Sequence, residues 1–176
     1  MCHRFRNYCA STGVIALGLT LTFAAASYAG SGKIDACKLV SATAAGRVLG
    51  TRVTVKAVDT SAAGSGAASI CNYNTGSLHG GFMLLAGRIH YTDAAAEVAY
   101  QKQTATLDVP PGMAKPSFAD VKGLGEAAYL LKARGSFQLH VLAHGTAIVI
   151  SMLHDASPKA LVQSKRLARI ALGNLK

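Results

Sequence analysis

The chain has 176 residues, of which 51% are apolar and 15% are charged, and its formal net charge is +10. This high apolar content with few charges excludes an intrinsically disordered chain, and 18 glycines with 4 prolines exclude a collagen-like or low-complexity composition. The length fits one domain with its own packed core.

The N-terminus has the three parts of a secretory signal peptide. Two arginines give a basic start, an apolar run extends from Val14 to Ala26, and Ser27-Tyr28-Ala29 supplies a small-x-small cleavage site. We therefore predict a signal peptide over residues 1–29 and a single exported domain over residues 30–176, periplasmic or secreted. An uncleaved leader would be a membrane anchor and would export the same domain, because the positive end stays inside.

Gly30, and not a cysteine, follows the predicted cleavage site, so lipidation is not expected. A membrane is thus a partner only if the leader is uncleaved. Cleavage removes two arginines and no acid, which lowers the net charge from +10 to +8.

Two cysteines, Cys37 and Cys71, remain after the leader. In an oxidising compartment, an even pair in a small exported domain favours a disulfide. The alternative is a redox-active pair or a catalytic thiol. The chain has no C-x-x-C spacing here and no basic or histidine-rich stretch beside either cysteine, so the disulfide is the preferred interpretation.

The mature chain begins with one helix and three strands. Ser41 is suited to cap a helix and Gly50 to end it. Val53, Val55 and Ala57 alternate with polar residues, as in a half-exposed strand. The predicted elements are a helix from Ser41 to Leu49 and strands from Arg52 to Asp59, Ala68 to Asn74, and about Gly81 to His90.

A second helix and an irregular connection follow. Thr92 and Asp93 can cap a helix over Ala94 to Gln103, a stretch of high helix propensity. The segment from Leu107 to Phe118 contains Pro110-Pro111-Gly112, so we predict irregular structure there and a candidate ligand-facing loop.

The last part reads as a three-stranded meander and a helix. Arg134-Gly135 and His144-Gly145 have turn chemistry, and Ser157 followed by Pro158 is a typical helix start. The predicted strands are Glu126 to Ala133, Phe137 to Val141 and Thr146 to Leu153.

These elements predict an α+β fold with a largely antiparallel sheet of about six strands, helices packed on one face, and one disulfide. The two halves share a β-β-β-α order, which is the order that an internal duplication would produce. Their residue-level similarity is too weak to establish one.

Basic residues are scattered along the chain except for Lys165, Arg166 and Arg169, which share the outer side of the last helix. We interpret this cluster as the contact for an anionic partner, such as an envelope polymer or a protein. No aromatic residues alternate with the bases, so a specific nucleic-acid role is not expected.

Three short motifs carry a family resemblance: Asp35-Ala36-Cys37-Lys38-Leu39, Cys71-Asn72-Tyr73 and Gly123-Leu124-Gly125-Glu126-Ala127-Ala128. Together they resemble small exported bacterial domains, many of them lipoproteins, of unknown function. The resemblance spans most of the mature chain at scattered positions. It implies that Cys37 and Cys71 are bonded and that Gly123 marks entry to the second part of the sheet, and it implies no catalytic residue.

An enzymatic or metal-binding role is the alternative interpretation, and it would use His140, His144 or His154. A metal site needs three or four ligands that converge, and the sequence shows no such spacing. A hydrolase would need a placed nucleophile, and no nucleophile-elbow sequence is present. We therefore predict a non-enzymatic binding domain without cofactor or metal.

Overall fold

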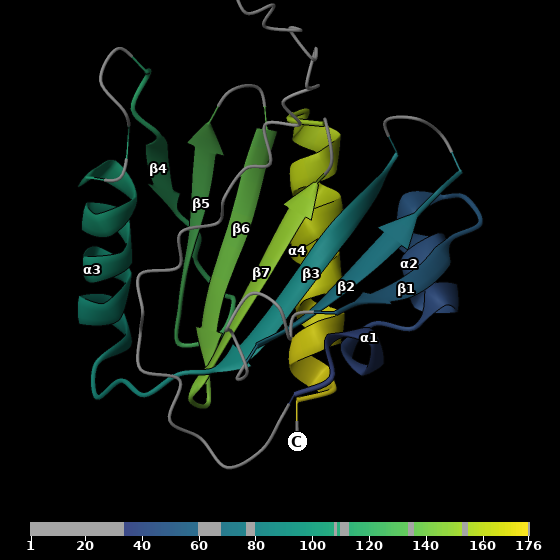
Figure 1. Cartoon of the computed structure of the whole chain (residues 1–176), viewed down its shortest axis with the longest axis horizontal. Helices are drawn as coiled ribbons and strands as arrows, with labels where there is room; N and C mark the ends of the chain where they lie inside the picture. The colour runs from purple at the N-terminus through teal and green to yellow at the C-terminus, as the bar shows by residue number, and fades with distance from the viewer. Residues whose placement is uncertain are drawn as a thin grey trace, which may run out of the picture.

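The strands form a seven-stranded sheet in the order β1-β2-β3-β7-β6-β5-β4, and every neighbouring pair is antiparallel (Figure 1). The computed structural model describes residues 34–59, 68–76, 80–107, 109, 113–133, 136–152 and 155–175. The predicted signal peptide, the Arg134-Gly135 turn and His154 lie outside these residues. The strands are β1 Thr54–Val58, β2 Ala68–Asn74, β3 Gly81–Arg88, β4 Ser117–Asp120, β5 Ala127–Ala133, β6 Ser136–Ala143 and β7 Thr146–Met152.

The two faces of the sheet are both apolar at its centre. In β7, Ile148 and Ile150 point to the main core, while Ala147 and Val149 point to the opposite side. All seven residues of β7 are buried, as a strand covered on both faces requires. We call the side with the main core the α4 face and the other side the α3 face.

Three helices cover the α4 face: α1 Ala36–Leu39, α2 Ala42–Leu49 and α4 Pro158–Gly173. Their starts follow local chemistry. Ser41 Oγ accepts a hydrogen bond from the amide of Ala44, and Ser157 Oγ accepts one from Ala160. Gly50 ends α2 in the left-handed region with φ 75°. The predicted α+β fold and both predicted caps are therefore confirmed.

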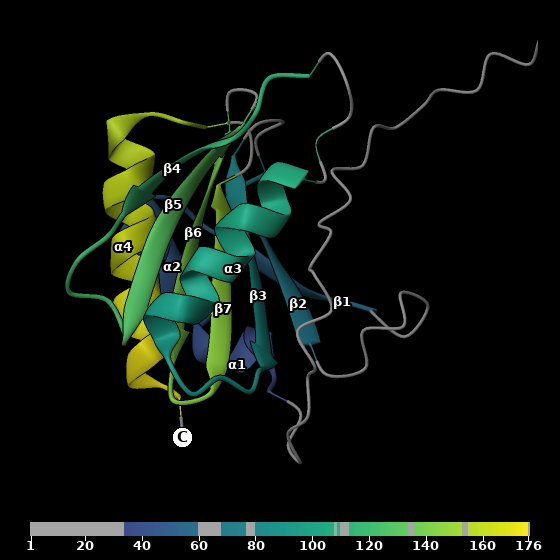
Figure 2. The same cartoon turned by 90° about the vertical axis from the view of Figure 1, so that its left-hand side faces the viewer.

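Helix α3, Ala94–Leu107, lies on the other face, against β5 (Figure 2). Its buried residue Val98 joins a second cluster with Tyr129 and Leu142. The expectation that the helices share one face thus holds for α1, α2 and α4 and is wrong for α3. The connection after α3 also contains a short edge strand, β4, where the prolines predicted irregular structure throughout.

The strand order allows a test of whether the two β-β-β-α halves are related by symmetry, as an internal duplication would leave them. The two meanders, β1-β2-β3 and β5-β6-β7, meet through their third strands, since β3 pairs with β7 over seven residues. A twofold axis through that pairing would keep the helix after each meander on the same face. Because α3 and α4 lie on opposite faces, the helices do not follow such an axis.

The disulfide attaches α1 to the sheet. The sulfur atoms of Cys37 and Cys71 are 2.02 Å apart, and Cys71 is fully buried in β2. Two residues further along β2, the hydroxyl of Tyr73 donates a hydrogen bond to the carbonyl of Val40 at 2.7 Å. The predicted disulfide is therefore confirmed, and it holds the N-terminal helices over the core. None of the described helices is long and apolar enough to cross a bilayer.

Candidate functional site

The outer side of α4 carries the bases that the sequence singled out. Arg166 and Arg169 are exposed and Lys165 is half-buried, whereas Leu167 and Ala168 of the same turns are fully buried in the core. The 3.6-residue period places the three bases on one side of the helix. We call this surface, with Lys159, the basic face of α4.

Lys159 was missed in the sequence reading because it stands alone, six residues before the cluster. It is exposed, and helical geometry returns it to the same side as Arg166. From Lys159 to Arg169 the basic face extends about 15 Å along the helix. Exposed Val162 lies between them, and α4 contains no acidic residue.

Helix α2 lies beside α4, because the side-chain amide of Gln163 donates a hydrogen bond to the carbonyl of Val48 at 3.3 Å. Arg47 of α2 is exposed. Like α4, α2 contains no acid. In the described parts of the chain, the ion pairs that form lie elsewhere and do not neutralise α4.

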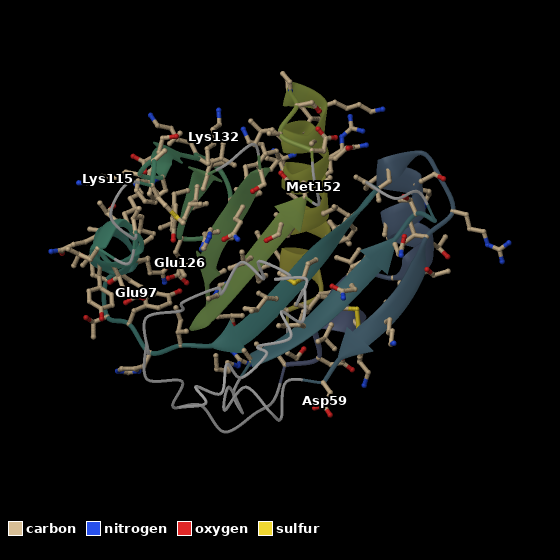
Figure 3. All side chains as sticks on the ribbon, turned by 45° about the horizontal axis from the view of Figure 1, so that its top comes forward. Asp59, Glu97, Lys115, Glu126, Lys132 and Met152 are labelled. Atoms are coloured by element: carbon tan, nitrogen blue, oxygen red, sulfur yellow. A yellow bond between two sulfur atoms is a disulfide. The ribbon has the colours of Figure 1, made fainter. Side chains whose placement is uncertain are left out.

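Some of the acidic residues lie on the side of α3. Glu97 and Glu126 both lie on that side of the molecule, while nitrogen-tipped side chains project around the upper part of α4 (Figure 3). Asp120 of β4 pairs with Lys102 of α3. Exposed lysines also lie on β1, in the β4–β5 connection and on β5, but α4 combines four bases with no acid.

His140 of β6 is buried in the α3 face. Its Nδ1 atom lies 3.1 Å from the hydroxyl of Tyr129, and its ring stacks on the Tyr129 ring with centroids 4.5 Å apart. Its Nε2 atom lies 3.1 Å from Oε1 of Gln138. Desolvation lowers the pKa of His140 to about 3, so the imidazole is neutral at physiological pH.

His144 lies apart from His140, in the tight turn between β6 and β7. Residues His144 and Gly145 have φ of 51° and 66°, the values of a two-residue hairpin turn. The carboxylate of Glu126 accepts hydrogen bonds from the His144 amide at 2.8 Å and from the Tyr91 hydroxyl at 3.0 Å. These bonds lower the pKa of Glu126. Glu126 therefore stabilises the β6–β7 turn through its bond to the His144 amide.

His140 and His144 have separate surroundings in the described structure. Within the described residues, no group of three His, Cys, Asp or Glu side chains could hold a metal ion. Ser157, one of the two serines three residues from His154, uses its hydroxyl as the cap of α4.

Comparisons with known proteins add little to this picture. No family model matches the chain, and no curated protein matches it. Among solved structures, a GTP-binding regulator from Thermotoga maritima is similar at a TM-score of 0.36 and 13% identity, over 76% of this chain and 89% of that one. The chain's own residues therefore carry the functional argument.

Proposed function

We propose that this protein is an exported, non-enzymatic domain that binds an anionic partner, an envelope polymer or an acidic protein surface, through the basic face of α4. The observation that carries the proposal is the set of Lys159, Lys165, Arg166 and Arg169 on one side of a helix without acids. Export is supported by the leader pattern of residues 1–29 and by the Cys37–Cys71 disulfide, which persists in oxidising compartments.

The basic face lies on a helix that is packed against the sheet, which favours a role in binding over a role in solubility alone. The inner side of α4 packs on β6 and β7, so the spacing of the four bases is fixed before any partner arrives. Such a surface attracts a polyanion at long range, and the attraction is screened over about 8 Å at physiological ionic strength. Binding should therefore weaken steeply with added salt.

The experiment compares two triple variants that lose the same net charge. One replaces Lys165, Arg166 and Arg169 with Gln. The control replaces three exposed lysines of β1, the β4–β5 connection and β5, namely Lys56, Lys122 and Lys132. Each purified chain is applied to immobilised heparin and to vesicles of phosphatidylglycerol, and the salt concentration for release is measured.

We expect the α4 variant to be released at clearly lower salt than the parent chain, and the control to stay close to the parent. Equal losses in both variants would show that net charge alone causes retention, and would refute a specific basic face. Retention on heparin but not on vesicles would identify a polymer as the partner, and the reverse a lipid surface.

A further inference from the structure

A series of hydrogen bonds joins α3 to the sheet at His140. The side-chain amide of Gln101 donates to the Glu97 carboxylate at 2.8 Å, and the Tyr129 hydroxyl donates to Oε1 of Gln101 at 3.1 Å. The Tyr129 oxygen in turn lies 3.1 Å from Nδ1 of His140. The series therefore leads from α3 through β5 to a buried imidazole of β6, which the proposed function does not use.

The direction of these hydrogen bonds determines where His140 carries its proton. A tyrosine hydroxyl has one hydrogen, and that of Tyr129 is already donated to Gln101. The Nδ1 atom of His140 therefore donates to the Tyr129 oxygen, so the neutral ring is protonated at Nδ1 and bare at Nε2. A second proton can enter only at Nε2, on the side of Gln138.

Uncharged groups surround His140 in this arrangement. Its two ring nitrogens face the Tyr129 hydroxyl and the Gln138 side-chain amide, and Val149 lies directly opposite it on β7. His140 is 9% exposed and Tyr129 is 1% exposed, so water has little access to either ring. A charged imidazolium would need water or a carboxylate, and its described neighbours offer neither.

The charged side chains of the surrounding elements do not compensate for such a charge. On α3, Glu97 accepts from a glutamine of its own helix, and Lys102 pairs with Asp120 of β4. Lys132 of β5 lies on the opposite face of the sheet, and Glu126 before β5 bonds the β6–β7 turn. No further charged residue occurs in β6 or β7. Carboxylates and lysines keep their charges between pH 5 and pH 7, so among these groups only the histidine changes its charge.

Helix α3 is held to the sheet by few buried groups. Val98 is the one buried residue of its fourteen, and the helix contacts mainly β5. Its ion pair with β4 is exposed on the side of Asp120, and exposed pairs contribute about 0–1 kcal/mol. The helix lies outside the sheet (Figure 2), so it can separate without breaking a strand pairing.

We propose that α3 is a movable cover, which separates from the sheet when His140 takes up a second proton. Separation breaks the bond between Gln101 and Tyr129 and lets water reach the imidazole. It also uncovers the apolar cluster on which Val98 packs, formed by Ile89, Tyr129, Leu142 and Ala147. This cover is on the sheet face opposite the basic face of α4, so the proposal does not depend on the anionic partner proposed above.

Hydrogen exchange with mass spectrometry tests the proposal on the purified, disulfide-bonded chain at pH 7 and pH 5. Each rate is divided by the intrinsic rate of an unstructured peptide at the same pH, so that it reports an opening equilibrium. The key variant is His140→Gln. The control is His90→Gln, which changes an exposed histidine in the connection that leads into α3. Amides of β6 and β7, measured in the same samples, show whether each variant is folded.

We expect α3 amides to exchange through an opening of lower free energy than that of β6 and β7. From pH 7 to pH 5 this opening should become about 25-fold more frequent in the parent, because the pKa of His140 is about 3 when covered and 6.5 when exposed. The increase should persist in His90→Gln and disappear in His140→Gln. Nitrogen-15 NMR of the parent at pH 7 should show His140 protonated at Nδ1 and bare at Nε2.

Four results would each overturn the proposal. The first is exchange of α3 at the same free energy as β6 and β7. The second is an opening of α3 that does not change between pH 7 and pH 5, and the third is an unchanged increase in folded His140→Gln. The fourth is protonation of the neutral ring at Nε2, because Tyr129 would then donate to His140 and not to α3.

Discussion

At the scale of single residues, His140 makes the stability of this domain depend on pH. Its folded pKa of about 3 lies below the unfolded value of 6.5. Between these values the unfolded chain binds a proton that the folded chain does not, so stability present above pH 6.5 is lost as the pH falls. Between pH 7 and pH 5, His140 should lower the free energy of unfolding by about 2 kcal/mol.

Urea unfolding of the parent and of His140→Gln at both pH values measures this loss. The variant should lack the His140 contribution and show a smaller pH dependence. His90→Gln, which changes an exposed histidine, serves as the control and should keep the parental dependence. An unchanged slope in His140→Gln would mean that the imidazole is not buried in its neutral form.

Tyr73 illustrates the stabilising effect of a single buried hydroxyl. It donates to the Val40 carbonyl, and its ring stacks on Phe82 with centroids 4.1 Å apart. Burial raises the pKa of Tyr73 to about 12, so the phenol remains a donor at any physiological pH. Tyr73→Phe keeps the stacking but leaves the carbonyl unpaired, and should lower the free energy of unfolding by about 1–3 kcal/mol.

The matched control is Tyr100→Phe, because the Tyr100 side chain is 50% exposed. Its effect in the same urea titration should stay within about 0.5 kcal/mol. If both tyrosine variants behaved alike, the contact between Tyr73 and Val40 would not stabilise the fold.

At the scale of elements, the disulfide holds α1, a four-residue helix too short to persist alone. The covalent loop of 34 residues stabilises the domain by about 4 kcal/mol in the chain-entropy model. Replacing both Cys37 and Cys71 with Ala should lower the free energy of unfolding by about 4 kcal/mol. It should also make the backbone of α1 the first site of limited proteolysis.

Chemical denaturation and mass mapping of the proteolytic fragments measure these two effects. Reduction of the parent chain with dithiothreitol is the control, and should reproduce both results without any substitution. First cleavage elsewhere, with α1 still protected, would show that Tyr73 and the core hold this helix without the covalent bond.

Elements with strong local chemistry could be predicted from the sequence. Ser41, Gly50 and Ser157 act within one turn of their own helix. Strand β4 could not be predicted, because it has four residues, follows Pro116 and contains one half-buried side chain, Phe118. Its strand character comes from pairing with β5.

The same distinction holds for the candidate site. Lys165, Arg166 and Arg169 are close in sequence, so helical spacing alone placed them together. Lys159 joins them only through the length of α4. Likewise, Tyr129 and His140 come from different strands, and their contact depends on a register that no local pattern encodes.

At the scale of the whole molecule, the sheet separates two different surfaces. The α4 face carries a helical layer whose helices contain bases and no acids. The other face carries α3, the stacked pair of Tyr129 and His140, and a small apolar cluster.

The central pairing of β3 with β7 also determines how the molecule unfolds. This pairing spans seven residues, and β7 is hydrogen-bonded to β6 over seven more. The main core then draws side chains from both meanders and from α1, α2 and α4. Neither meander can bury its apolar face alone, so we expect both to unfold in one cooperative step.

Native-state hydrogen exchange followed by mass spectrometry tests this expectation. Amides of β3, β6 and β7 should exchange with one common free energy, equal to that from urea unfolding. The edge strands β1 and β4, which are mostly exposed and paired on one side, should exchange faster. Because the β3 and β6 amides report on different meanders, exchange of β3 at a lower free energy than β6 would show that the first meander opens independently. Each half would then be a folding unit of its own, as the shared β-β-β order would suggest, in spite of the single core.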